Sequence, residues 1–182
     1  MNNKKHDGLT GLLRKNVLEE MFLQLVEEGS NRFALVLIDI DRLIHYNDKY
    51  GHLQADEFIK QLAHLISQQI PENGKAFRIG GDEFVILLVE ANATEATSVA
   101  ETIRKLTENQ FSQIVVELIS FYTISEKTFV LPTSTSSFTI SCGIAFYPDN
   151  GDELNTLLAA ADNAMYEKAK RLGGNKVALA SN

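Results

Sequence analysis

The chain has few of the features that mark secreted or membrane-bound proteins. Its 182 residues include a single cysteine, Cys142, which excludes an internal disulfide and is compatible with a reducing compartment. No apolar run approaches the roughly 20 residues that a membrane helix requires. The polar start, residues 1–5, lacks the apolar core of a signal peptide. We therefore expect a cytoplasmic domain without a membrane segment.

Positive charge is also scarce. The chain has 17 lysines and arginines against 24 aspartates and glutamates, which gives a net charge of −7. Surfaces that bind nucleic acids are normally basic, so we expect no nucleic-acid partner. The apolar share of 45% and the charged share of 23% are ordinary for a globular protein. At this length we expect one domain over residues 1–182, with residues 1–6 as a tail.

The pattern of residues 76–89 predicts a β-hairpin. Two strand-like apolar stretches, residues 76–79 and 84–89, flank a pair of glycines. A glycine pair between apolar runs is typical of a hairpin turn. The tip of this hairpin carries two adjacent carboxylates, Asp82 and Glu83.

The residues of this tip suit a charged ligand. Gly80 and Gly81 have no Cβ atom, so a bulky group such as a nucleotide can lie against their backbone. Asp82 and Glu83 can bind a hard cation such as Mg²⁺ or accept a proton. The alternative is an acidic surface hairpin without a ligand, because glycine pairs and acidic pairs are common in turns.

A second acidic segment favours the ligand over this alternative. Residues 33–41 are an apolar run that ends in Asp39-Ile40-Asp41, which predicts a buried central strand ending at a cleft or sheet edge. Asp39 and Asp41 then point the same way, and their charges repel unless a cation or a proton intervenes. Asp39 together with Asp82 from a neighbouring strand would satisfy Mg²⁺. For Asp41 the alternative is a cap on the helix that follows.

Five further segments follow one another in a recognisable order. They are Asp7-Gly8-Leu9-Thr10-Gly11-Leu12, Asp39-Ile40-Asp41, Asn47-Asp48-Lys49-Tyr50-Gly51-His52 with Asp56, Ser141-Cys142-Gly143-Ile144-Ala145, and Ala161-Asp162-Asn163-Ala164-Met165-Tyr166. Together with the hairpin, these segments resemble the motifs of the GGDEF domain, the catalytic domain of diguanylate cyclases. So many matches in the family's order argue against coincidence.

The resemblance implies an enzyme that condenses two GTP molecules into cyclic di-GMP and releases two pyrophosphates. Each domain would bind one GTP, so activity would require an antiparallel homodimer. Mg²⁺, or alternatively Mn²⁺, would be the cofactor. Family members commonly carry a sensor domain before the first motif, but only six residues precede Asp7. We therefore expect either an excised catalytic domain or a regulator on a separate chain.

The resemblance also implies roles for the acidic residues. Asp39 and Asp82 would hold the metal with help from the Ile40 carbonyl. Glu83 would be a metal ligand or would assist deprotonation of the 3′-hydroxyl, so the catalytic residues would be Glu83 and Asp82. The glycine pair of the hairpin would border the bound substrate.

Substrate recognition would fall to a second group of residues. Asn47 and Asp56 would select guanine, because a carboxylate accepts hydrogen bonds from guanine N1 and N2 while an amide both donates and accepts. The alternatives are a helix cap or turn for Asn47 and an exposed helix position for Asp56. The backbone amides of Arg42, Leu43 and Ile44 and the ammonium of Lys170 would contact phosphate.

Two departures from the family pattern reduce the positive charge of the site. Ile44 stands where the family often has a phosphate-binding lysine, and Gly174 stands where it has an arginine. One extra residue leaves Lys168 and Arg171 as substitutes for Lys170 if the register shifts. The alternative function is therefore a weak or inactive GGDEF module that binds GTP or a protein partner. A third class, a different palm-type nucleotidyl cyclase, is disfavoured by the guanine-selecting pair.

Apolar periodicity predicts alternating helices and strands. The order suits an α/β (α+β) fold of the palm type, with a largely antiparallel central sheet flanked by helices and an internal hairpin. Besides the segments above, we expect helices over 16–28, 54–69, 94–107 and within 151–171, and strands over 138–146 and 176–179.

The segment from about 112 to 137 is longer than the connection requires. Its apolar runs Ile114–Val116 and Phe129–Leu131 predict an inserted hairpin, followed by a loop over 132–137. The insertion could dock a partner, shape a dimer or be a neutral surface elaboration.

Overall fold

The computed structural model describes residues 5–30, 32–123 and 138–181, and these form a six-stranded sheet with the order β1-β3-β4-β2-β5-β6. The four inner strands pair antiparallel with one another, whereas β1 and β6 at the two edges run parallel to their neighbours. The predicted, largely antiparallel sheet is confirmed. In chain order the strands are β1 (Leu13–Arg14), β2 (Phe33–Ile40), β3 (Gly74–Arg78), β4 (Glu83–Val89), β5 (Ile140–Tyr147) and β6 (Val177–Leu179).

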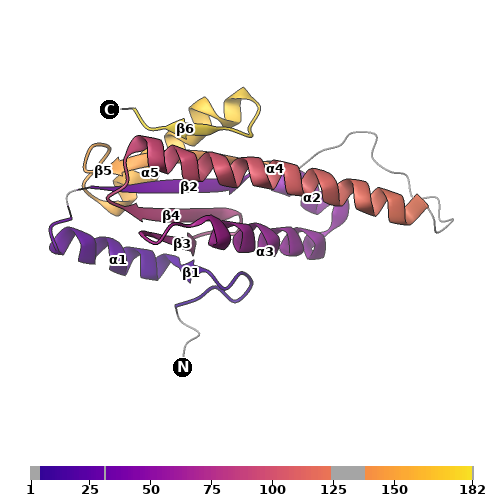
Figure 1. Cartoon of the computed structure of the whole chain (residues 1–182), viewed down its shortest axis with the longest axis horizontal. Coiled ribbons are helices and arrows are strands. Elements are labelled where there is room, and N and C mark those ends of the chain that lie inside the picture. Colours follow the sequence, from indigo (N-terminus) through magenta and orange to yellow (C-terminus); the bar gives the residue numbers. More distant parts are fainter. Residues whose placement is uncertain (1–4, 31, 124–137, 182) are drawn as a thin grey trace.

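Helices cover both faces of the sheet (Figure 1). α1 and α5 pack on the face that carries Phe33, Leu35 and Leu37 of β2, and α3 and α4 pack on the face that carries Val36 and Ile38. Among the described residues, no helix combines the length and the apolarity needed to cross a membrane. The helices are α1 (Lys15–Glu27), α2 (Leu43–Tyr50), α3 (His52–Gln69), α4 (Ala93–Thr123), α5 (Leu154–Lys168) and the short 3₁₀ helix η1 (Lys170–Leu172).

β2 is the central strand of the fold. It pairs with β4 on one side and with β5 on the other, and helices cover both of its faces. Because a strand in this position meets apolar neighbours in every direction, its residues are apolar and buried throughout, with Asp39 as the one partly exposed residue of the strand. The strand therefore delivers a carboxylate to the point where the apolar core ends.

The predicted hairpin is formed by β3 and β4. Their register runs from Gly74 opposite Leu88 to Arg78 opposite Phe84. The turn closes where the backbone N–H groups of Ile79 and Gly80 donate to the carbonyl oxygen of Glu83, at 3.0 and 3.4 Å. The acidic tip of the hairpin thus lies beside the end of β2, because β4 is the direct neighbour of β2.

Gly51 sets the corner between α2 and α3. Its φ of +85° is accessible to glycine without the strain that a side chain would add. Its backbone N–H donates to the carbonyl oxygen of Asn47 at 2.9 Å and closes α2. Asn47 and Asp56 consequently lie on two consecutive helices that meet at one glycine.

The helix predicted over 94–107 is much longer than expected, and this corrects part of the predicted insertion. α4 has 31 residues and continues past the sheet (Figure 1). Ile114–Val116, predicted as a strand of an inserted hairpin, lies within this helix. The β-branched residues favour a strand locally, but the helix that precedes them continues through them. The rest of the predicted hairpin and loop, 124–137, lies outside the described residues.

Gly143 allows α5 to lie directly on β5. A Cβ atom at this position would overlap with the carbonyl oxygen of Ala161, a backbone atom of α5 that a side-chain rotation cannot remove. We predict that Gly143→Ala lowers the free energy of unfolding by about 3 kcal/mol, because the added methyl group pushes the helix away from the sheet. Urea unfolding followed by circular dichroism measures this change.

Gly8→Ala is the matched control for this prediction. Among the described residues, none except its chain neighbours has an atom within 4 Å of a Cβ built at Gly8. The control should therefore unfold within about 0.5 kcal/mol of the wild type. Equal unfolding curves for Gly143→Ala and Gly8→Ala would contradict the close approach of α5 to β5.

Candidate functional site

Carboxylates from β2 and from the β3–β4 turn converge at one end of the sheet. Asp39 lies directly opposite Glu83 in the antiparallel pair of β2 and β4. Directly opposite residues of an antiparallel pair point to the same face, so the two carboxylates share one side of the sheet. Asp82 precedes Glu83 in the turn, and its charge acts on Asp39. The structure therefore brings together the acids that the sequence predicted to act together.

Asp39 is the most perturbed acid of this group. Burial raises the pKa of its carboxyl to about 6, and the charges of Asp82 and Asp41 add to the rise. The Lys170 ammonium, with Nζ 2.5 Å from Oδ1 of Asp39, acts in the opposite direction. The end of β2 is thus a place where negative charge is in excess and a cation is stabilised.

The structure resolves which basic residue meets the acids. Lys170 opens η1, directly after the end of α5, and reaches Asp39. Lys168, considered as a substitute, donates to the carbonyl oxygen of Leu179 and to the hydroxyl of Ser181. Arg171 pairs with Glu167. Both alternatives are therefore engaged away from Asp39.

Asp41 accepts three hydrogen bonds and does not cap α2. Its carboxylate accepts hydrogen bonds from the hydroxyls of Thr139 and Ser141, both at 2.7 Å, and from the backbone N–H of Asn175 at 2.9 Å. The start of α2 at Arg42 has no side-chain cap. Asp41 thus ties the end of β2 to β5 and to the loop after η1.

The two glycines of the hairpin differ in their surroundings. A Cβ atom on Gly80 would collide with the Glu83 carboxylate, which folds over this glycine. In the part of the chain that the structure describes, no atom beyond the adjoining residues lies within 4 Å of a Cβ built on Gly81, so the backbone is open there. Both glycines were predicted to face a ligand. Gly81 leaves space for one, whereas the space beside Gly80 is filled by the Glu83 carboxylate.

An ion pair that the sequence did not reveal holds the hairpin tip. Nη1 of Arg78 lies 2.9 Å from Oδ1 of Asp7, and Nη2 donates to the carbonyl oxygen of Gly81 at 2.7 Å. Asp7 also accepts the backbone N–H and the hydroxyl of Thr10. The first motif of the chain and the hairpin are therefore one unit, joined across 71 positions of sequence.

The predicted guanine-selecting residues lie on α2 and α3. Asn47 is partly buried, and its Oδ1 atom is buried without a hydrogen-bond partner among the described residues. Asp56 is partly buried on the first turns of α3. A buried carbonyl oxygen without a partner is costly, so Asn47 is suited to accept a hydrogen bond from a ligand.

The start of α2 suits an anion. Leu43 and Ile44 are its first residues, and the helix begins without a side-chain cap. Their backbone N–H groups lack partners within the helix, as in the first turn of any helix, and an anion can fill this place. The Ile44 side chain is 72% exposed, so the position where a cation is missing faces solvent.

Comparison with known proteins identifies the family. The model of the family described as "Diguanylate cyclase, GGDEF domain" matches residues 4–176. The chain belongs to the GGDEF domain family. In this GGDEF domain the hairpin motif forms the acidic tip beside β2, as the sequence predicted.

The relatives include proteins named as cyclases. The chain is 32% identical to diguanylate cyclase DgcM of Escherichia coli strain K12, over 96% of the chain and 38% of DgcM. It is 34% identical to the uncharacterized protein YhcK of Bacillus subtilis strain 168, over 94% of the chain and 44% of YhcK. The chain thus spans about two fifths of the length of these relatives.

A solved GGDEF domain confirms the fold. The GGDEF domain of DgcB from Caulobacter crescentus, crystallised with c-di-GMP, superposes with a TM-score of 0.78. The alignment covers 100% of this chain and 96% of the DgcB chain at 24% identity. The palm-like arrangement is therefore that of known GGDEF domains.

The Asp7–Arg78 pair generates a prediction on acid stability. Burial alone would raise the pKa of Asp7, but the hydrogen bonds from Arg78 and Thr10 outweigh it and lower the pKa to about 2. Above the unfolded pKa of about 4 this difference stabilises the fold, and the contribution disappears as the pH falls toward 2. Between about pH 5 and pH 3 the wild type should lose about 1 kcal/mol more unfolding free energy than Asp7→Asn.

Urea unfolding at the two pH values measures this difference. Glu20→Gln, which removes an exposed carboxyl of α1, serves as the control and should follow the wild type. The ion pair would have no energetic role if Asp7→Asn and the wild type lost the same free energy.

Proposed function

We propose that this GGDEF domain is a diguanylate cyclase that condenses two GTP molecules into cyclic di-GMP. The observation that supports it is the acidic end of β2, where the buried Asp39 lies opposite Glu83 with Lys170 as its counter-charge. Open backbone at Gly81 and at the start of α2 borders this end of the sheet. The arrangement suits a triphosphate, which needs cations and backbone N–H groups together.

The donor set fits Mg²⁺. Within the described residues, no three or more His, Cys, Asp or Glu side chains gather as a metal site. Mg²⁺ usually takes one or two protein carboxylates and completes its octahedron with waters and phosphate oxygens. Asp39 and Asp82, with the Ile40 carbonyl, would supply that smaller set. Bound there, the ion would offset the charge of the triphosphate and of the leaving pyrophosphate.

The raised pKa of Asp39 supports this assignment. Its carboxyl is buried beside other acids, and among the described residues Lys170 is the one cation that pairs with it. A divalent cation would also compensate its charge and would free Lys170 to contact the phosphates. The divalent cation and Lys170 are alternative partners of the Asp39 carboxylate. Once a triphosphate adds negative charge, the cation would pair with Asp39 and Lys170 would pair with the phosphates.

The chain's own residues orient the nucleotide. Asn47 would accept a hydrogen bond from the guanine edge with its unpartnered Oδ1, and Asp56 would accept from guanine N1 and N2. The N–H groups of Leu43 and Ile44 would hold phosphate oxygens at the start of α2. Glu83 lies near the reacting end and would accept the proton of the 3′-hydroxyl or complete the metal set.

One chain holds one nucleotide, so two chains must face each other. In the antiparallel pair, each 3′-oxygen attacks the α-phosphorus of the partner's GTP, a P–O bond forms, and pyrophosphate leaves with the electrons of the bond that breaks. The cytoplasmic location and an upstream sensor domain or protein stay predictions. A sensor is compatible with relatives of which the chain covers only 44% and 38%.

A weak or inactive GTP-binding module is the second candidate. Two observations favour it: Ile44 projects an apolar side chain where the family often has a lysine, and Gly174 lies at φ +78° where the family has an arginine. Charge-assisted hydrogen bonds to phosphate are among the stronger hydrogen bonds, so the absence of two cations lowers the affinity for GTP.

A product assay separates the two candidates. With Mg²⁺ and GTP the wild type should form cyclic di-GMP, identified by mass, and Asp82→Ala and Glu83→Gln should lose about 100-fold or more of this rate. Asp152→Asn, an exposed carboxylate outside the site, should keep it. GTP binding without product would support the second candidate, and cyclisation of a single nucleotide or a preference for ATP would contradict both.

The two charge-deficient positions should respond differently to repair. We predict that Ile44→Lys lowers the KM for GTP by about three- to tenfold, an effect that added salt should weaken. Gly174→Arg should not lower it, because an L residue is strained at this φ and its Cβ would lie 2.9 Å from the Asp41 carboxylate. Ile44→Gln is the neutral control, and an equal gain from Ile44→Gln would refute the role of charge.

A further inference from the structure

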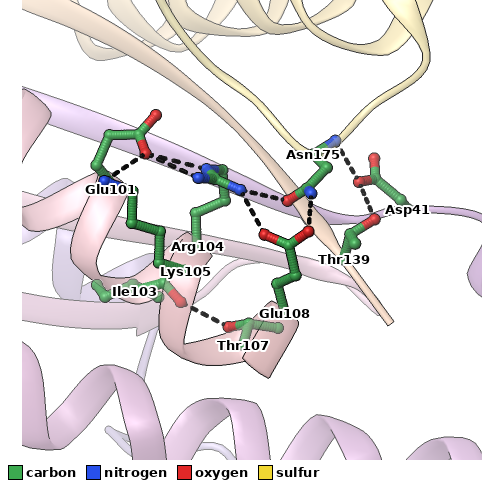
Figure 2. A network of polar contacts seen from close by, with 9 residues as sticks. All are labelled: Asp41, Glu101, Ile103, Arg104, Lys105, Thr107, Glu108, Thr139 and Asn175. Carbon is green, nitrogen blue, oxygen red and sulfur yellow. Dashed lines mark hydrogen bonds and ion pairs between the residues drawn. The ribbon is translucent and has the colours of Figure 1, made fainter. Parts of the chain in front are cut away.

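A polar network joins α4 to the loop that follows Lys170 (Figure 2). Its centre is Arg104, whose side chain is 12% exposed. The guanidinium donates to Glu101 through Nε and Nη2, and through Nη1 it donates to Glu108 at 3.1 Å and to Asn175 at 2.7 Å. Burial would lower the pKa of Arg104, but Glu101 and Glu108 outweigh it and raise the pKa. The cation is thus held firmly by two carboxylates on its own helix.

Asn175 is the point where the helix meets the loop. Its side-chain oxygen accepts from Arg104, and its side-chain nitrogen donates to Glu108 at 2.9 Å. Its backbone N–H donates to Asp41 at 2.9 Å. All three groups of this residue are used, two toward α4 and one toward the end of β2 (Figure 2).

Backbone hydrogen bonds connect the loop before Asn175 to Lys170. Gly173 donates its N–H to the carbonyl oxygen of Lys170 at 3.1 Å, and Gly174 donates to that of Ala169 at 3.0 Å. Gly173, Gly174 and Asn175 all have positive φ, a conformation that the two glycines adopt without strain. Asn175 can adopt this conformation at lower cost than most side chains. These hydrogen bonds connect the backbone before Asn175 to the start of η1.

We propose that Arg104, Glu108 and Asn175 are positioning residues that hold Lys170 opposite Asp39. Arg104 and Glu108 are paired with each other on α4, so the Asn175 side chain binds groups that are already held in place. Through these bonds Asn175 would hold the loop, and with it Lys170, in position. The use of Lys170 for a triphosphate rests on the proposed function, whereas its placement opposite Asp39 does not. The sequence separation of Arg104 and Asn175, 71 positions, explains why no local pattern reveals the link.

Two variants break the network without touching Lys170. Asn175→Gly keeps the positive φ and the backbone N–H to Asp41 but removes both side-chain bonds to α4. Glu108→Ala removes the carboxylate that binds Asn175 and Arg104 from the α4 side. Arg32→Ala is the matched control, because it removes an arginine–carboxylate pair with Asp149 at the opposite end of β2.

The first measurement is independent of nucleotide. An ammonium held in an ion pair exchanges slowly with water and gives a ¹H–¹⁵N correlation in NMR, which Lys170→Gln assigns. The Lys170 signal should be present in the wild type and in Arg32→Ala, and it should broaden or disappear in Asn175→Gly and Glu108→Ala. An unchanged signal in both network variants would overturn the positioning role.

The second measurement is binding of GTP and of guanosine by calorimetry. Each network variant should raise the Kd of GTP about tenfold and leave the Kd of guanosine unchanged, because Lys170 serves the phosphates alone. The double variant should be no weaker than about tenfold, since both changes act through one network. If the network had a purely structural role, its variants would raise the Kd of GTP and the Kd of guanosine by the same factor. That result would overturn the proposal, and so would network variants whose Kd values match those of Arg32→Ala.

The two hypotheses fail in different ways. A wild type that binds neither GTP nor guanosine, with a Lys170 signal lost in the network variants, would refute the proposed function and leave the placement of Lys170 supported. A wild type that makes cyclic di-GMP, with network variants of unchanged GTP affinity and unchanged Lys170 signal, would refute the positioning role alone.

Discussion

The pairing of β2 with both β4 and β5 is the constraint on which the rest of the structure depends. It buries an eight-residue strand between two helical layers and places Asp39, the second-last residue of that strand, opposite Glu83 on one side and Ser141 on the other. A shift of the register by one residue would turn every side chain to the opposite face, which would place Asp39 in an apolar layer. The stability of the core and the position of the acids are therefore one property.

The site is built around excess negative charge. Asp41 is stabilised by two hydroxyls and a backbone N–H, and Asp39 by Lys170, but burial still raises the pKa of Asp39 to about 6. Carboxylates kept in such surroundings cost folding free energy, which the large apolar core offsets. Carboxylates with pKa values raised in this way are common where a protein binds cations or performs acid–base chemistry.

Local patterns predicted β2, the hairpin and the helix α3, because each depends on residues that are close in sequence. The two-residue strand β1 is too short to leave a pattern. The β-branched run Ile114–Val116 was assigned to a strand, since local preference cannot show that a preceding helix continues. The partners of Asp41 lie 100 and 134 positions away at Ser141 and Asn175, so only the folded chain reveals them. An inserted residue left three basic candidates, and the packing of η1 selected Lys170.

α4 is longer than the central strand that it covers. At 31 residues the helix is about 46 Å long, while the eight residues of β2 span about 26 Å. The helix therefore exceeds the span of β2 by about 20 Å, and the contact between Arg104 and Asn175 lies in its first half.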